Sequence, residues 1–177
     1  HRGLRTITAR TRENDHMVSV VTSGMGTPSL EITLNELILL KELNLETRER
    51  HDTWTGLNII RVGTSGGMQA ETELGTSIIS AYGLGLDNTA PFLRIKYSDP
   101  AVQTEIRKRV MDEFARHIEI AKVKGFPDSD CIRPYVSAAD PEIVKTLKEA
   151  AEAAGIKHKV GITASNSGFF ANQGRKV

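Results

Sequence analysis

A short run near the middle of the chain, IIRVGTSGG at residues 59–67, holds residue types that bind anions. Arg61 stands inside the apolar part of the run, where a guanidinium without a partner would be costly to bury. A guanidinium donates paired hydrogen bonds to a phosphate or a carboxylate, and the hydroxyl of Thr64 is a further donor. The glycines allow the backbone to approach such an anion closely. We therefore predict an anion pocket at the end of a short, mostly buried strand over residues 58–62.

A buried ion pair is the alternative interpretation of the same arginine. A carboxylate elsewhere in the chain would neutralise the charge of Arg61 and leave the run without any ligand. The acidic side chains considered for this role are Glu31, Glu36 and Glu71.

The C-terminal run SNSGFFANQGRKV, residues 165–177, places side chains that suit a pyrimidine base within a few positions of one another. The amide of Gln173 offers one donor and one acceptor side by side, which complements the imide edge of a base such as uracil. Arg175 can donate to a base carbonyl, and Phe169 offers a face for stacking. Each of these residues taken alone is more often a surface or core residue, so their close spacing is what favours a base-binding role.

A third polar loop, TSGMGTPS at residues 22–29, lies between a predicted strand and a predicted helix. Its backbone N–H groups and the helix N-terminus suit an anion, and a plain tight turn is the alternative explanation. The loop lacks the Gly-Lys-Ser/Thr of a Walker loop and the spacing of the dinucleotide fingerprint. The histidines of the chain show no metal-ligand spacing, so we expect no metal site.

Strands and helices alternate along the chain, which predicts an α/β fold on a largely parallel or mixed sheet. Polar loops follow three of the predicted strands, and in such sheets ligands bind where strands end. The N-caps expected for the second and third helices are Asp99 and Asp140. The predicted strands cover residues 17–22, 58–62, 74–81 and 157–164, the predicted helices cover residues 29–43, 100–122 and 141–155, residues 82–97 are expected to be irregular, and residues 125–140 form a loop of uncertain strand content.

The bulk composition is that of one ordinary α/β domain. The chain has 177 residues and a formal net charge of +1, which favours neither nucleic acid nor an anionic membrane as a partner. Cys131 is the single cysteine, so an intramolecular disulfide and a metal–thiolate cluster are excluded, and a reducing cytoplasmic compartment is expected. No apolar run is long enough for a transmembrane helix. We expect residues 1–177 to form a single domain that is incomplete at both ends, because the chain opens at His1 rather than at a methionine.

Three pieces of the chain, SGMGTPS, IIRVGTSGG and GITASNSGFFANQGR, occur in the order and near the spacing found in the nucleoside phosphorylase family. The chain resembles the uridine phosphorylase type within that family, because the Phe-x3-Gln-x-Arg spacing in the last piece is typical of uridine enzymes. The resemblance covers most of the chain but is poor over residues 44–57 and 82–140. It implies a three-layer α/β sandwich with a central mixed sheet.

The resemblance also implies how phosphate would be bound. Arg61 and Thr64 would be ligands of the phosphate, and Thr64 would also lie near the ribose. Arg2, in the opening HRGLRT, is similar to a family arginine that reaches the phosphate of a neighbouring subunit.

The implied base site lies in the C-terminal run. Phe169 would pack against the base and the sugar, while Gln173 and Arg175 would hold the uracil edge. Together with Arg61 and Thr64, Arg175 would then be one of the residues on which catalysis depends.

The activity implied by the resemblance is the reversible phosphorolysis of uridine to uracil and ribose 1-phosphate, in pyrimidine salvage. Inorganic phosphate would be a co-substrate, and no cofactor would be needed. The implied setting is the cytoplasm, and the implied assembly is a homo-oligomer, either a dimer or a hexamer. The family's N-terminal phosphate-binding glycine loop and its ribose-binding Glu-Met-Glu segment would lie outside the chain. The alternatives are a nucleoside phosphorylase or hydrolase of other base specificity, and a non-catalytic nucleoside-binding relative.

Overall fold

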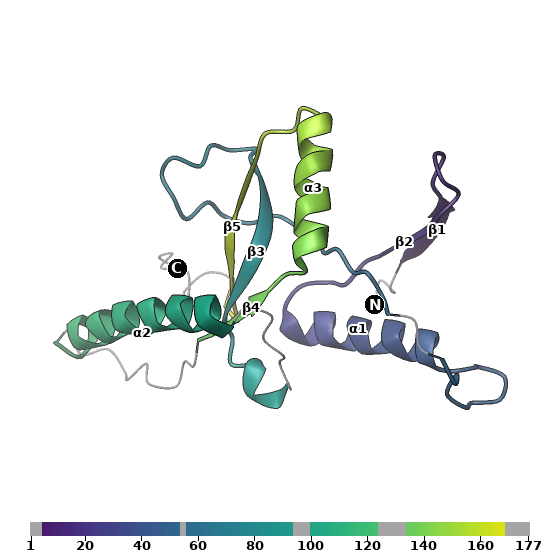
Figure 1. Cartoon of the computed structure of the whole chain (residues 1–177). Coiled ribbons are helices and arrows are strands. Elements are labelled where there is room, and N and C mark those ends of the chain that lie inside the picture. The colour runs from purple at the N-terminus through teal and green to yellow at the C-terminus, as the bar shows by residue number, and fades with distance from the viewer. Residues whose placement is uncertain (1–4, 54–55, 94–99, 124–133, 169–177) are drawn as a thin grey trace. The chain divides into compact units, whose positions relative to one another are not determined.

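The computed structural model describes residues 5–53, 56–93, 100–123 and 134–168 (Figure 1). The chain divides into two compact units, His1–Gly63 and Thr64–Val177, each of which has most of its residue contacts within itself. Each unit has its own secondary structure, and the expectation of a single domain stays a prediction.

The first unit begins with a β-hairpin formed by β1 (Thr6–Arg10) and β2 (Met17–Val21). Residues that lie directly opposite each other in an antiparallel pair share one face of the hairpin. One face carries Thr8 and Ser19, whose hydroxyls form a hydrogen bond of 2.9 Å. The strand predicted at the position of β2 is confirmed, whereas β1 is not among the predicted strands. The other face of the hairpin is apolar and is formed by Ile7, Ala9, Val18 and Val20.

A glycine turn leads from β2 into α1 (Thr27–Glu42). Gly24 and Gly26 have φ angles of 68° and 84°, a region in which a side chain would be strained. Pro28 lies in the first turn of the helix, where its missing N–H has no intrahelical partner to lose. The helix predicted over residues 29–43 and the tight glycine turn before it are therefore confirmed.

Residues 58–62 do not form the buried strand that their composition predicts. They belong to no strand, and the side chains of Ile59, Ile60 and Val62 are exposed. An extended segment becomes a strand only where a neighbouring strand pairs with its backbone N–H and C=O groups. Within the described part of the first unit, the sheet consists of β1 and β2 alone. The prediction was wrong because an apolar run does not by itself provide that neighbour.

The second unit contains a three-stranded sheet in the order β4–β3–β5. β3 (Ser77–Leu86) is central, β5 (His158–Asn166) runs parallel to it, and β4 (Tyr135–Ala138) runs antiparallel to it. The sheet is therefore mixed, and the predicted α/β class with a central mixed sheet is confirmed. Because Leu86 is paired with Asn166, the chain leaves β3 and β5 at the same edge of the sheet (Figure 1).

β3 includes residues 82–86, which the sequence predicts as irregular. The low strand propensity of Gly83 and Gly85 favours that prediction. In the structure β3 pairs there with β4 on one side and with β5 on the other. Backbone pairing on both sides outweighs the cost of the glycines, so the prediction for residues 82–86 was wrong.

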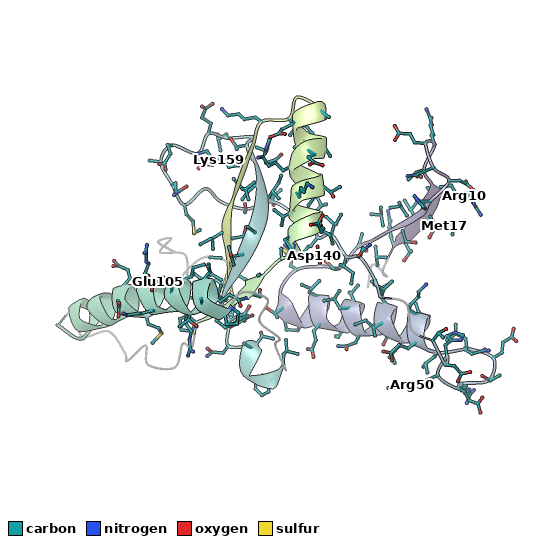
Figure 2. All side chains as sticks on the ribbon, in the orientation of Figure 1. Arg10, Met17, Arg50, Glu105, Asp140 and Lys159 are labelled. Carbon is teal, nitrogen blue, oxygen red and sulfur yellow. The ribbon has the colours of Figure 1, made fainter. Side chains whose placement is uncertain are left out.

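The described residues of the second unit also form two long helices and a short 3-10 turn (Ala90–Phe92). α2 (Pro100–Val123) contacts β4, and α3 (Pro141–Ala153) packs against β3 and β5 (Figure 1). Both helices confirm predicted ones. The predicted N-cap of α3 is also confirmed, because the carboxylate of Asp140 accepts hydrogen bonds of 2.9 and 3.1 Å from two N–H groups in the first turn (Figure 2). The other expected cap, Asp99, lies outside the described residues.

The buried apolar side chains of the described residues belong to the second unit. Val136 on β4 is 2% exposed, and Ala151 on α3 is 9% exposed. These two positions mark where β4 and α3 contribute to the interior around the central strand.

Candidate functional site

Polar side chains converge at the carboxyl ends of the parallel strands β3 and β5. Asp87 directly follows β3, and its Oδ1 accepts a hydrogen bond of 2.9 Å from the hydroxyl of Tyr135, the first residue of β4. Its Oδ2 accepts a hydrogen bond of 3.2 Å from the hydroxyl of Ser165 near the end of β5. The backbone N–H of Thr89 also donates to Oδ1, at 3.0 Å. One carboxylate thus joins β3, β4 and β5 at the edge where open α/β sheets bind ligands.

We call Asp87, Tyr135 and Ser165 the carboxyl-edge cluster. Gly85 makes room for it, because Gly85 and Tyr135 are directly opposed in the register of β3 and β4. A methyl group on Gly85 would overlap the tyrosine ring. Without a side chain at this position, the ring lies across β3 and its hydroxyl reaches Asp87.

The environment of Tyr135 keeps its hydroxyl protonated. Burial, and after it the hydrogen bond to the Asp87 carboxylate, raises the pKa of Tyr135 to about 12. The physical reason is that a phenolate here would lose solvation and would be repelled by a neighbouring negative charge. Tyr135 is therefore a hydrogen-bond donor to Asp87 throughout the neutral pH range.

Alkaline unfolding tests the pKa of Tyr135. An unfolded tyrosine releases its proton at about pH 10, whereas native Tyr135 holds its proton until about pH 12. Between these values the unfolded state binds fewer protons, so the free energy of unfolding falls as the pH rises. We expect Tyr135→Phe to remove this part of the fall, as measured by urea unfolding of both proteins at about pH 8 and about pH 11. An equal fall in the two proteins would contradict the raised pKa.

The chain leaves β5 through a turn that one of its own side chains closes. Oδ1 of Asn166, the last residue of β5, accepts a hydrogen bond of 3.1 Å from the N–H of Gly168. Earlier in the strand, a hydrogen bond of 2.5 Å between the hydroxyls of Ser80 and Thr163 joins β3 to β5. The predicted base-binding segment follows directly in the sequence, so these contacts lie at its start.

The two predicted phosphate ligands within the described residues, Arg61 and Thr64, are both exposed. The expected burial of Arg61 was wrong, since the segment around it is not a strand. Its guanidinium turns back toward Gly63, with Nη1 3.4 Å from the place that a Cβ of residue 63 would occupy. Thr64 begins the second unit. The phosphate-binding roles of both residues stay predictions.

The ion pair considered for Arg61 is not formed with the acidic residues of its own unit. Among the described residues of the first unit, neither Glu31 nor Glu36 pairs with Arg61. Glu71 belongs to the second unit, where its backbone carbonyl accepts a hydrogen bond of 3.2 Å from Nζ of Lys159. Within its own unit, Arg61 therefore has no carboxylate among the described residues that would compete with a bound anion.

The remaining predicted site residues lie outside the described residues, and their roles stay predictions. They are Arg2, Phe169, Gln173 and Arg175.

Sequence reasoning missed the carboxyl-edge cluster. Asp87 is 48 positions from Tyr135 and 78 positions from Ser165, so no local motif contains them. The one available signal was a polar residue directly after a strand, which the prediction of an irregular segment over residues 82–97 concealed.

Metal ligands and membrane spans were searched for among the described residues. Those residues include no group of three or more histidine, cysteine, aspartate or glutamate side chains that could hold a metal ion. Of the helices in the same part of the chain, none has the length and apolar character needed to cross a membrane.

Comparison with known proteins identifies the family. Residues 1–177 match the family model of the phosphorylase superfamily. The chain belongs to this superfamily. The match extends over both units and includes the three sequence pieces SGMGTPS, IIRVGTSGG and GITASNSGFFANQGR.

One related sequence and one related structure show what the chain is similar to. The uridine phosphorylase of Thermococcus kodakarensis is 29% identical over 176 residues, which cover 99% of this chain and 44% of the relative. A crystal structure of a Trypanosoma brucei nucleoside phosphorylase, described as showing uridine phosphorylase activity, is 26% identical and superposes with a TM-score of 0.75, covering 100% of this chain and 57% of that one. The structural match confirms the nucleoside phosphorylase-like fold. The chain spans about half the length of these relatives.

Proposed function

We propose that the protein is a uridine phosphorylase, which converts uridine and phosphate to uracil and ribose 1-phosphate in a reversible reaction. The observation that carries the proposal is the Phe-x3-Gln-x-Arg spacing of Phe169, Gln173 and Arg175, which begins three positions after the end of β5. The similarity of almost the whole chain to a protein named uridine phosphorylase supports it. The proposal concerns the full-length protein, since the chain spans about half of its relatives.

The chemistry accounts for the residue types. An oxygen of phosphate forms a bond to C1′ of the ribose as the bond from C1′ to the base nitrogen breaks, and the bonding electron pair leaves with the base. Negative charge then develops on the uracil, where Gln173 and Arg175 would donate hydrogen bonds to it. The departing uracil takes up a proton from solvent. Arg61 and Thr64 would hold the phosphate in line with C1′, which makes the attack nearly unimolecular.

No covalent intermediate on a side chain is required by this scheme. The catalytic contributions would come from orientation of phosphate and from stabilisation of the leaving group, which are the two effects that arginine, threonine and glutamine can supply. Inorganic phosphate is the co-substrate, and the scheme needs no cofactor.

The assembly and setting of the enzyme are part of the same proposal. Arg2 would complete the phosphate site of a neighbouring subunit, which requires a homo-oligomer such as a dimer or a hexamer. The protein would act in pyrimidine salvage in the cytoplasm, with no nucleic acid or membrane partner.

Release of uracil from uridine by the full-length protein tests the proposal. The reaction is followed with and without phosphate, and inosine is offered in parallel. We expect uracil release that requires phosphate, with inosine left intact. Release without phosphate would indicate a hydrolase, cleavage of inosine would indicate a different base specificity, and uracil binding without any release would indicate a non-catalytic relative. Each of these three results would overturn the proposed activity.

A further inference from the structure

We propose that Asp87 is a positioning residue for the base site, because it holds the carboxyl end of β5 and so sets where the chain enters the base-binding segment. The proposal rests on the proposed function, which places the uracil ligands in that segment. It adds a residue directly after β3 that none of the sequence motifs contains.

The geometry of the carboxylate supports this role. Oδ1 accepts from Tyr135 at 2.9 Å and Oδ2 accepts from Ser165 at 3.2 Å, so the two oxygens hold two different strands. The N–H of Thr89 donates to the same carboxylate at 3.0 Å, which fixes Asp87 against its own backbone. Asp87 is half-buried, so its hydrogen bonds are partly shielded from water.

The position of Ser165 connects this anchor to the base site. Ser165 precedes Phe169 by four positions in the sequence, and the last strand residue, Asn166, closes the turn by accepting from the N–H of Gly168. A shift of the end of β5 therefore moves the start of the segment that would contact the base. Misplacement of binding groups by about 1 Å is enough to cost about 10²-fold in rate.

An asparagine at position 87 separates geometry from charge. Its amide oxygen can accept from Tyr135 and from the N–H of Thr89, and its amide nitrogen can donate to the hydroxyl oxygen of Ser165. Asp87→Asn therefore keeps every one of these contacts while it removes the negative charge. Asp87→Ala removes the contacts as well as the charge.

The test compares Asp87→Ala and Asp87→Asn in the full-length protein, with Asp140→Ala as the matched control. Asp140 is an aspartate of the same unit whose carboxylate caps α3, so its loss weakens a helix end without touching the carboxyl-edge cluster. We expect Asp87→Ala to raise the KM for uridine at least about tenfold and to leave the KM for phosphate within about twofold. Asp87→Asn and Asp140→Ala should keep both KM values close to those of the wild type.

Two kinetic outcomes would overturn the proposal. If Asp87→Asn is as impaired as Asp87→Ala, the carboxylate acts through its charge rather than by holding β5. If Asp87→Ala changes neither KM when rates are normalised to folded protein, as in Asp140→Ala, its role is purely structural.

Amide hydrogen exchange separates failure of this proposal from failure of the proposed function. We expect exchange in the peptide covering residues 160–168 to be faster in Asp87→Ala than in the wild type, and unchanged in Asp87→Asn and Asp140→Ala. Absence of uracil release by the wild type would refute the uridine phosphorylase assignment, whereas unchanged exchange in Asp87→Ala would refute the anchoring role whatever the activity.

Discussion

Replacing Arg61 with alanine is expected to lower kcat/KM for phosphate in the proposed phosphorolysis by about 10²–10³-fold, the loss that follows removal of one donor from an anion site. The guanidinium would hold phosphate through two parallel hydrogen bonds, which a shorter apolar side chain cannot replace. Arg61→Lys should recover only part of the loss, because an ammonium keeps the charge without the planar pair of donors. Steady-state kinetics with phosphate varied at saturating uridine measure both variants.

The exposure of Arg61 makes this a clean experiment. An exposed arginine without an ion pair in its own unit contributes little to folding, so we expect its removal to change the free energy of unfolding by no more than about 0.5 kcal/mol. Arg12→Ala is the matched control, because Arg12 is an exposed arginine of the same unit, in the turn between β1 and β2, and its replacement removes the same charge. An unchanged KM for phosphate in Arg61→Ala, or an equal rise in Arg12→Ala, would exclude Arg61 from the phosphate site.

Replacing Gly85 with alanine is expected to lower the free energy of unfolding by about 1–3 kcal/mol, the usual cost of forcing an extra carbon into a packed position. The new methyl group would overlap the Tyr135 ring, which cannot move aside without giving up its hydrogen bond to Asp87. Urea unfolding of the full-length protein measures the loss, since the unfolding midpoint reports stability when the slope is unchanged.

Two further variants identify the cause of that loss. Gly161→Ala is the matched control, because Gly161 is a strand glycine in the same sheet with open space where its Cβ would lie. We expect it to be neutral or slightly stabilising, because alanine has the smaller entropy to lose on folding. Tyr135→Ala should cost less in the Gly85→Ala background than in the wild type, since the two side chains compete for one space. Strict additivity of the two substitutions would show that the overlap is not the reason.

The parts of the fold that sequence predicts well are those decided by local chemistry. α3 follows from the Asp140 cap and a glycine, Gly155, that adopts a φ of 63° just after the helix end. α1 follows from its apolar periodicity and from Pro28 in its first turn. In these cases the residues that determine the structure are neighbours along the chain.

The parts that sequence predicts poorly are decided by contacts between distant segments. Gly83 and Gly85 are residue types common in turns, yet both lie on the same face of β3. The side chains of Ser137 and Tyr135 on β4 come close to them there. The prediction for residues 58–62 was wrong in the opposite direction. Their apolar pattern suits a strand, but the described part of their unit offers no strand that pairs with them.

The residues of the candidate site also differ in whether the sequence alone reveals them. Arg61 and Thr64 are identified by residue type and spacing, which sequence displays directly. Asp87 gains its place through partners that lie far away along the chain, and only the paired ends of β3 and β5 bring them together.

The parallel pairing of β3 with β5 also sets the order in which the second unit can be built during synthesis. Ser80 and Thr163, which join the two strands, are 83 positions apart. At about 5–20 residues per second, a ribosome needs several seconds to produce β5 after β3 has emerged. For more than half of that interval the central strand has neither neighbour in place, because β4 also follows β3 late in the sequence. Such long-range pairing makes folding slow, so we expect the nascent chain to depend on chaperones until β5 closes the sheet.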